Sequence, residues 1–528
     1  MTVYSDPKDW ELHWDNEFKD QRDDRSTGLN ANGPGGAVHC TENGTVVFSY
    51  AYGKSSVANG VDFTVDQTPC GIRSVTKVMT AAMVLHAEQA SQSADLPNTA
   101  WNSVGVIDRP ISDFSVINNN IDRWKNKYLP EAARDPLATG APTPGSYPFN
   151  KNKSNTNYPF SYPLSDTTDK VSLRMLASHQ SGYYEIGKWA DPDTFRWRPC
   201  YSPEVAIGIE TLADPSDPFD RKLQFTDWTQ EDNLAAYKNY NETLGSVDDI
   251  VAQAGAVLRG RPSTTPFNCN DPATFTANIA TYTDKAGWLA AAICEELFED
   301  SYYNLLQDQF DRLELENAYP AMYGQMWSTA LNLGNKNYQW HFAFKGHHAN
   351  GREIPGFAVP YSRIPTPDNT AEEIIVEPNQ SMESFYAIGC AIMTAKDLNT
   401  WGHNILAKNS PWDGYLLPIL SNELFTQQTN TGDLINDKKT FGSINWALGN
   451  AVMEPIQRIT HAPGEYLECY GMLGQGGFHG HGGAMVWVQK PGSTGNFEAG
   501  LVFSAVTNTG ISVGSVYQMA KDYVESFV

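Results

Sequence analysis

The run Gly71-Ile72-Arg73-Ser74-Val75-Thr76-Lys77 leads directly into Val78-Met79-Thr80-Ala81-Ala82-Met83-Val84-Leu85, an apolar segment rich in helix formers. This pattern predicts a buried helix with Ser74 at its N-terminus and Lys77 one turn further on. Residues three apart on a helix lie on the same face, so the two side chains are expected to be neighbours.

A serine hydroxyl is a weak nucleophile until a neighbouring group accepts its proton, and an amine in a partly dry site can do so. The N-terminus of the helix also stabilises negative charge that develops on Ser74. The S-x-x-K spacing is short enough to occur by chance, and a capped surface helix would carry it equally well. The rest of the chain therefore has to support the interpretation.

Three further segments accompany this run. Asn43-Gly44 separates two apolar stretches, at residues 35–40 and 45–53, and predicts a hairpin. His179-Gln180-Ser181-Gly182 follows a short apolar segment, and we interpret His179 as a structural residue that braces the turn. Gly480-His481-Gly482-Gly483 precedes the strand-like residues 484–488.

Together with the glycine-containing turn into a helix at residues 387–398, these ordered segments resemble the serine β-lactamase-like superfamily. The superfamily includes class C β-lactamases, D,D-peptidases, D-aminopeptidases, esterases and acyltransferases. The resemblance implies an α+β (α/β) fold, in which N- and C-terminal helices flank an antiparallel sheet beside a mostly helical region. We expect an N-terminal extension over residues 1–33 and a catalytic domain over 34–528, with insertions at about 91–170 and 183–280.

The resemblance implies that Ser74 is the nucleophile and Lys77 its partner. It also implies a Tyr-x-Asn element, whose phenol moves the proton between nucleophile and leaving group. Tyr282-Thr283-Asp284 precedes an apolar helix but carries Asp284 in place of Asn, and a carboxylate beside Lys77 would keep the ammonium charged. Tyr237-Lys238-Asn239 matches literally but lies in a polar stretch. We favour Tyr282 over Tyr237.

The family's third element, Lys-Thr-Gly or His-x-Gly, lies on the strand that borders the site. His481-Gly482-Gly483 fits the second form, with His481 as a proton donor or acceptor near neutral pH. Gly482 and Gly483 would let substrate lie against the strand. The N–H groups of Ala484 and Ser74 would form the oxyanion hole. The histidine form is typical of peptidases and esterases, which argues against a true β-lactamase.

The charge and composition of the chain disfavour some classes of binding partner. The 528 residues include 37 basic and 61 acidic ones, and the net charge of −24 disfavours nucleic acid and anionic membranes. No apolar run is long enough to span a membrane, and the N-terminus does not resemble a signal peptide. The seven cysteines are odd in number and lack a C-x-x-C pattern, so we expect buried thiols and a cytoplasmic protein.

We expect no cofactor. His479 and His481 are spaced like two metal ligands, but the sequence offers no third, so no metal site is predicted.

The leading hypothesis is a serine hydrolase that forms an acyl-enzyme on Ser74, with an ester or lactone of a bulky small molecule as substrate. Tryptophans such as Trp288 would help to line its pocket, although core packing explains any one of them equally well. An acyltransferase, a D-amino-acid peptidase or amidase, and a catalytically silent ligand-binding protein are the alternatives. The sequence does not indicate the oligomeric state.

Overall fold

A computed structural model describes residues 33–118, 171–181, 284–320, 346–347, 353–365, 372–376, 387–408, 414–428, 445–457, 466–475, 481–489, 500–508, 520–522 and 524. Most of the two predicted insertions, and all but the last residue of the predicted N-terminal extension, lie outside these ranges.

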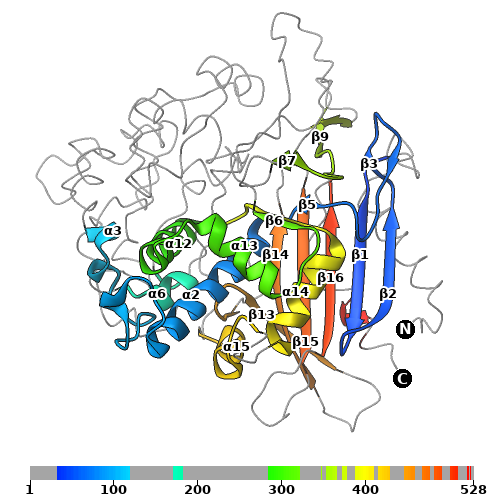
Figure 1. The fold of residues 1–528 in the computed structure, drawn as a ribbon. Coiled ribbons are helices and arrows are strands. Elements are labelled where there is room, and N and C mark those ends of the chain that lie inside the picture. Colours follow the sequence, from blue (N-terminus) through cyan, green and yellow to red (C-terminus); the bar gives the residue numbers. More distant parts are fainter. Residues whose placement is uncertain are drawn as a thin grey trace, which may run out of the picture.

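The largest element is a seven-stranded antiparallel sheet in the order β12-β13-β14-β15-β16-β1-β2 (Figure 1). Its strands come from both ends of the chain: β1 (Gly36–Glu42), β2 (Thr45–Tyr52), β12 (Asn445–Trp446), β13 (Ala451–Gln457), β14 (Tyr466–Gln475), β15 (Gly482–Gln489) and β16 (Leu501–Thr507). The sheet confirms the predicted α+β fold class with an antiparallel sheet.

The β1–β2 hairpin forms where the sequence predicts it. Asn43 and Gly44 both have positive φ, 49° and 77°, as the tight turn between twisted strands requires. A side chain at Gly44 would meet the ring of His403, because an added Cβ would lie 2.9 Å from its Nε2. Glycine is therefore needed here for conformation and for space.

Both faces of the central strands of the sheet are buried. Along β15, Met485 and Trp487 face the main core, while Val486 and Val488 face a smaller core on the opposite side. The main-core face is covered by α14 (Ala395–Ala407), in which Gly402 lies against Met485. The smaller core includes Ala520 and Val524 from the C-terminal helical turn, in agreement with the predicted flanking helix.

Helices beside the sheet surround α2 (Thr76–Ser93), which is buried along nearly its whole length (Figure 1). An all-round apolar helix is stable only in such an interior position. Among the described helices that contact α2 are α6 (Leu173–Ala177), α12 (Asp284–Phe298), α13 (Tyr302–Arg312) and α15 (Pro418–Phe425). The short elements η2 (Thr99–Trp101), η3 (Ile111–Asp113) and α3 (Ser115–Asn118) complete this region.

The described part of the chain also contains smaller sheets. A three-stranded sheet has the order β5-β11-β6, with β5 (Cys70–Gly71), β11 (Ala391–Met393) and β6 (Ala318–Pro320). The remaining strands form three pairs: β3 (Lys54–Ser56) with β4 (Val61–Asp62), β7 (Gly346–His347) with β8 (Glu353–Ile354), and β9 (Tyr361–Pro365) with β10 (Glu372–Val376).

The apolar helix expected after Tyr282-Thr283-Asp284 is α12, which ends at Phe298. The next helix, α13, is separate, because Glu299 adopts a positive φ of 52° and Ser301 caps α13. The side chain of Trp288 is buried in the main core, so it packs rather than lining an open pocket. The five cysteines in the described ranges are buried and outside any disulfide, as expected.

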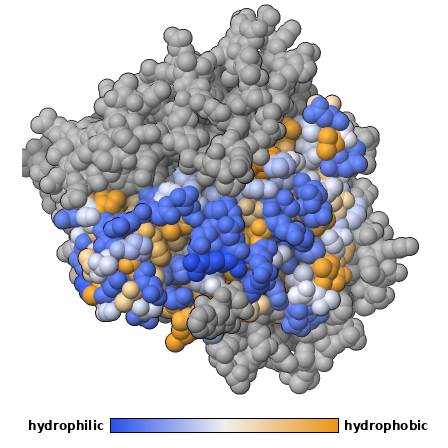
Figure 2. Space-filling model, in the orientation of Figure 1, coloured by the Kyte–Doolittle hydropathy of each residue, from blue (hydrophilic) through white to orange (hydrophobic). Residues whose placement is uncertain are grey.

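The surface of the described part is mainly hydrophilic, with small scattered apolar areas (Figure 2). Its exposed large apolar residues are few: Val46, Val57, Val61, Val104 and Ile419. None of its helices combines the length and the apolar character that crossing a membrane requires.

The fold keeps three histidines neutral near pH 7: His39 and His481, which are buried, and His86, which is half-buried. Burial lowers the pKa of His39 and of His86 to about 4, and that of His481 to about 3. The unfolded chain takes up protons at these sites below pH 6.5, while the folded chain does not until near pH 4. The free energy of unfolding should therefore fall by about 1 kcal/mol for each histidine between pH 7 and pH 5.5.

Chemical denaturation at the two pH values measures this change. His86→Phe is the matched variant, since the His86 ring stacks on Tyr415 with a centroid distance of 4.5 Å and phenylalanine keeps that packing. We expect a smaller pH dependence in the variant than in the wild type. An identical dependence would show that groups other than His86 cause it.

Candidate active site

The residues that precede Ser74 form a short bridge between the sheets. β5 pairs with β11, and the N–H of Ile72 donates to the carbonyl of Ala391 at 3.0 Å. Ile72 rests on Gly483 of β15, where an added Cβ would lie 2.9 Å from the Ile72 Cα. η1 (Arg73–Val75) then packs against β14 and β15 and leads into α2.

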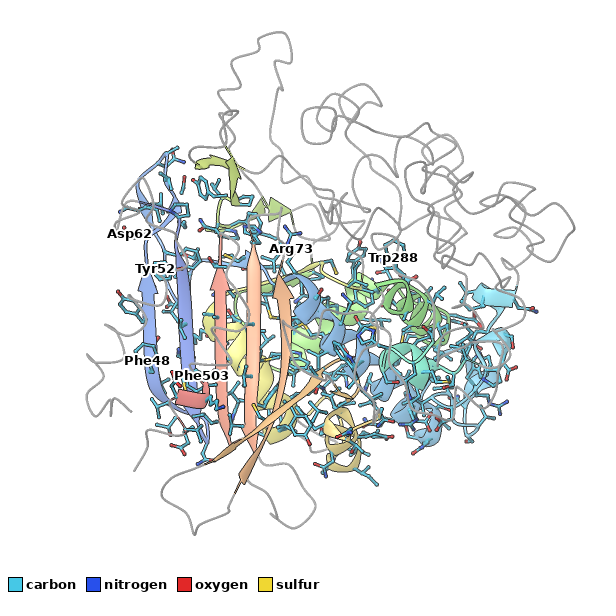
Figure 3. The ribbon with its side chains drawn as sticks, turned by 180° about the vertical axis from the view of Figure 1, so that it is seen from behind. Phe48, Tyr52, Asp62, Arg73, Trp288 and Phe503 are labelled. Atoms are coloured by element: carbon cyan, nitrogen blue, oxygen red, sulfur yellow. The ribbon has the colours of Figure 1, made fainter. Side chains whose placement is uncertain are left out.

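Arg73 has a φ of 52°, a strained value for a residue with a side chain, so the contacts around it must hold the backbone. Figure 3 shows Arg73 between the large sheet and the helices. The guanidinium is buried, and its charge lies near enough to His481 to lower the pKa of that ring. The residue directly before Ser74 is thus tightly enclosed.

Ser74 and Lys77 lie together, as the sequence predicts. The Nζ atom of Lys77 is 3.0 Å from the Oγ atom of Ser74 and 3.3 Å from the carbonyl oxygen of Ile388. Lys77 is only 4% exposed, while Ser74 is half-buried. The pair therefore combines a hydroxyl that substrate can approach with an amine shielded from water, which is the arrangement a serine nucleophile needs.

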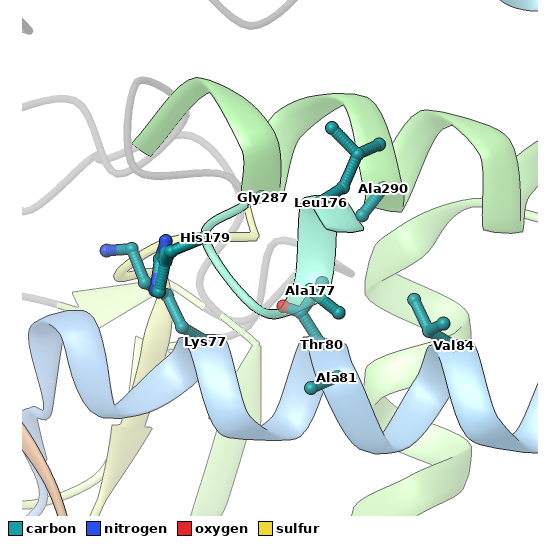
Figure 4. A pocket seen from close by; sticks show the side chains of 9 residues that line it. All are labelled: Lys77, Thr80, Ala81, Val84, Leu176, Ala177, His179, Gly287 and Ala290. Atoms are coloured by element: carbon teal, nitrogen blue, oxygen red, sulfur yellow. The ribbon is translucent and has the colours of Figure 1, made fainter. Parts of the chain in front are cut away.

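A small cavity adjoins Lys77 (Figure 4). Its walls come from α2, α6, α12 and the turn that follows α6. Most of the lining residues are apolar: Lys77, Thr80, Ala81, Val84, Leu176, Ala177, His179, Gly287 and Ala290. Gly287, in the first turns of α12, leaves room for Ile388, whose Cγ2 would be 2.7 Å from an added Cβ. Mostly apolar side chains therefore lie beside the amine of Lys77.

His179 belongs to this cavity, which the sequence analysis did not predict. It adopts a φ of 60° directly after the C-cap of α6, and the N–H of Gln180 donates to the carbonyl of Met175 at 2.8 Å. This is a Schellman ending with histidine in the position usually held by glycine. The ring packs edge-on against Trp446, with a centroid distance of 4.5 Å, so His179 braces the turn and also walls the cavity.

His481 departs from its predicted role as a proton donor or acceptor. Its Nδ1 accepts from the N–H of Gly71 at 3.3 Å, and its Nε2 lies 2.9 Å from the carbonyl oxygen of Ala358. The ring is fully buried, and burial is the main reason that its pKa falls to about 3. Both nitrogens are engaged with the backbone, and the ring stays neutral near neutral pH.

The predicted oxyanion contribution of Ala484 also differs from the geometry. Ala484 pairs with Leu473 of β14 on one side and with Ala505 of β16 on the other. In a strand paired on both sides, each N–H is used by a neighbouring strand, so the N–H of Ala484 is not available to substrate. Gly482 and Gly483 lie in the same ladder, and Gly483 serves the close approach of Ile72.

A different strand edge is open near η1. β13 pairs with β14 only up to Gly471, so no strand in the described part of the chain pairs with the outer side of Met472–Gln475. β14 contacts η1, and its Gly474 pairs with Gly483. The N–H groups on this edge are therefore the better candidates for stabilising an oxyanion.

The second-motif tyrosines, Tyr282 and Tyr237, lie outside the described residues, as does His479. Asp284 is the first residue of α12, and its side chain is not among those described. Within the described ranges, no three histidine, cysteine, aspartate or glutamate side chains are grouped as metal ligands would be.

The fold and part of the sequence are similar to those of known proteins. The sequence model of the Beta-lactamase family matches residues 18–226. The octameric penicillin-binding protein homologue from Pyrococcus abyssi superposes with a TM-score of 0.51 at 13% identity, over 98% of this chain and 77% of that one. No curated protein matches the sequence.

Two further solved structures are similar at lower TM-scores. A D-stereospecific amidohydrolase from a Streptomyces species has a TM-score of 0.46 at 14% identity, with 93% of each chain covered. EstCE1, a hydrolase with promiscuous acyltransferase activity, has a TM-score of 0.45 at 14% identity, again with 93% of each chain covered. The family match and the superposition on the penicillin-binding protein homologue lead to one conclusion: the chain has a β-lactamase-like fold, and its residues 18–226 resemble the Beta-lactamase family.

Proposed function

We propose that this protein is a serine hydrolase that acts through an acyl-enzyme on Ser74, with a neutral ester or lactone as its substrate. The observation that carries the proposal is the 3.0 Å separation between Ser74 Oγ and Lys77 Nζ in a site where the lysine is almost completely buried. A structural serine at a helix terminus would not need a buried amine at hydrogen-bonding distance.

The chemistry follows from this pair. Ser74 Oγ attacks the substrate carbonyl carbon while its proton passes to Lys77, and a tetrahedral oxyanion forms. The carbon–oxygen bond to the leaving alcohol then breaks, and the alkoxide takes up that proton. Water attacks the resulting ester of Ser74 in the same way, which releases the acid and restores the hydroxyl.

The oxyanion is stabilised by the N–H of Ser74 and by an outward N–H of the Met472–Gln475 edge. Preorganised backbone donors are usually the largest single contribution to acyl transfer. The contact between β14 and η1 supports this assignment, because η1 contains Ser74.

The strands beside Ser74 favour a substrate without a carboxylate near its scissile bond. Neither β14 nor β15 contains a lysine or arginine. β-Lactam antibiotics and D-alanyl-D-alanine peptides carry such a carboxylate, and its recognition needs a charge-assisted partner. An ester or lactone does not.

A fluorophosphonate probe with peptide mass mapping tests the proposal. We expect stoichiometric labelling of the peptide that contains Ser74, together with turnover of a para-nitrophenyl ester that exceeds turnover of a chromogenic cephalosporin or of a D-amino-acid anilide. Absence of labelling would favour a silent ligand-binding protein. Labelling with faster anilide turnover would reassign the substrate to the amides.

The second proton carrier is expected to be Tyr282. It lies five residues before Gly287, which shares the cavity with Lys77, and five residues span at most about 18 Å of extended chain. Tyr282→Phe should lower kcat about 100-fold or more, since it removes a general acid–base group. Tyr237→Phe is the matched variant and should be close to wild type. If Tyr237→Phe lost ester hydrolysis and Tyr282→Phe kept it, Tyr237 would be the second proton carrier instead of Tyr282.

A further inference from the structure

His481 connects three parts of the chain that meet behind the nucleophile. It lies directly before β15, accepts from the N–H of Gly71, and contacts the carbonyl of Ala358. Phe357 packs its ring against the imidazole edge-on, with a centroid distance of 5.0 Å. The N–H of Ala358 in turn donates to the carbonyl of Pro69 at 3.0 Å. Two connections therefore link the residues before Ser74 to residues 357–358. One is the direct hydrogen bond between Pro69 and Ala358, and the other is the His481 ring, which contacts both Gly71 and Ala358.

The two contacts require one protonation state of the ring. A backbone N–H can only donate, so Nδ1 must present its lone pair to Gly71. A carbonyl oxygen can only accept, so Nε2 must carry the hydrogen. Only the neutral Nε2–H tautomer makes both bonds. The buried position and the neighbouring charge of Arg73 keep the ring in this neutral form, because both lower its pKa.

The His481 ring contacts the residues directly before Ser74, and the backbone of these residues sets the direction of the Ser74 side chain. Gly71 lies three residues before Ser74, and an added Cβ on Gly71 would be 3.1 Å from Nδ1, so the backbone and the ring are in direct contact. Arg73, with its strained φ of 52°, lies between Gly71 and Ser74 in the chain. A strained residue keeps its conformation only when the residues on either side of it are fixed.

We propose that His481 is a positioning residue, which uses the neutral Nε2–H tautomer to fix the Gly71–Ser74 segment and thereby the direction of the Ser74 hydroxyl. The proposal rests on the proposed function of Ser74 as the nucleophile. It assigns His481 no proton transfer and no contact with substrate, because both ring nitrogens are bonded to the backbone and the side chain is fully buried.

Three substitutions separate the contributions of the ring. His481→Phe keeps the ring and removes both hydrogen bonds. His481→Asn places an acceptor near the position of Nδ1 and keeps the bond to Gly71. His481→Gln places a donor near the position of Nε2 and keeps the bond to Ala358. The measurements are the second-order rate constant for fluorophosphonate labelling of Ser74, kcat and KM for an ester, and Tm, each from pH 6 to pH 9.

A positioning role predicts that His481→Phe lowers the labelling rate and kcat about 10- to 100-fold with little change in KM, at temperatures at which the variant is folded. His481→Asn should recover most of the rate and His481→Gln less, because only the first holds Gly71. The pH dependence of the labelling rate and of kcat should have the same rising and falling limbs in the wild type as in the variants.

Two results would overturn the proposal. A pH limb that disappears in all three variants would make His481 a proton carrier. Labelling at the wild-type rate in the folded variants, with only Tm reduced, would make it a stabilising residue alone. If His481→Phe does not fold, the order of the Asn and Gln variants decides the question. Failure of the wild-type protein to label at Ser74 would refute the proposed function instead.

Discussion

Ser74→Ala is expected to abolish ester turnover and fluorophosphonate labelling while leaving the fold intact. Without Oγ no acyl-enzyme can form, so kcat should fall by about four orders of magnitude or more. The loss of stability should be small, about 1 kcal/mol, because Lys77 Nζ keeps its contact with the carbonyl of Ile388 at 3.3 Å. Ester hydrolysis and thermal unfolding measure the two effects.

Ser93→Ala is the matched control. Ser93 lies in the last turn of α2, where its hydroxyl donates to the carbonyl of Gln89 at 3.0 Å, and it lies at the opposite end of the helix from Ser74. The same loss of one oxygen there should leave turnover unchanged. Wild-type turnover in Ser74→Ala would refute the covalent mechanism, and equal losses in both variants would point to damage of α2 as a whole.

The elements that the sequence predicts well are those with local signals. Asn43-Gly44 specifies its own turn, since both residues tolerate positive φ. The proximity of Ser74 and Lys77 follows from their helical spacing across η1 and the first turn of α2, and α2 is buried along nearly its whole length, as its continuous apolar run indicates. Such features depend on residues within one or two turns of each other.

The strand that borders the site could not be identified in this way. Gly474 on β14 and Gly483 on β15 are direct partners in the ladder, and glycine-rich segments end one strand and begin the next. The motif at His481–Gly483 therefore resembles a site-lining strand, although pairing encloses it on both sides. Strand order is a long-range property, since it depends on contacts between β15, β16 and β14 that no local pattern encodes.

His179 illustrates a second limit. Its segment predicts a turn, and the turn is present, but the direction of the side chain follows from the left-handed backbone at φ 60°. Histidine is uncommon in that conformation, so the sequence gives little reason to expect it. The result is an imidazole in the same cavity as Lys77.

Replacement of Lys77 distinguishes a base from a fixed positive charge. Lys77→Met keeps the length of the side chain and removes the amine, so acylation of Ser74 should slow about 1,000-fold or more. Lys77→Arg keeps the charge, but guanidinium does not deprotonate in proteins and cannot accept the proton of Ser74. We therefore expect the arginine variant to be as inactive as the methionine variant when labelling rates are measured.

The thermal stability of Lys77→Met, unlike its labelling rate, should not fall. Lys77 is only 4% exposed, and burying an amine costs free energy that a methionine side chain avoids. Lys77→Met should thus unfold at the wild-type temperature or above it. Lys396→Met, which removes an exposed ammonium 3.0 Å from Glu316, is the control and should leave both labelling and Tm nearly unchanged.

A Lys77→Arg variant with more than about a tenth of the wild-type labelling rate would show that Lys77 contributes charge rather than proton transfer. A tenfold loss is far below the effect of a missing general base.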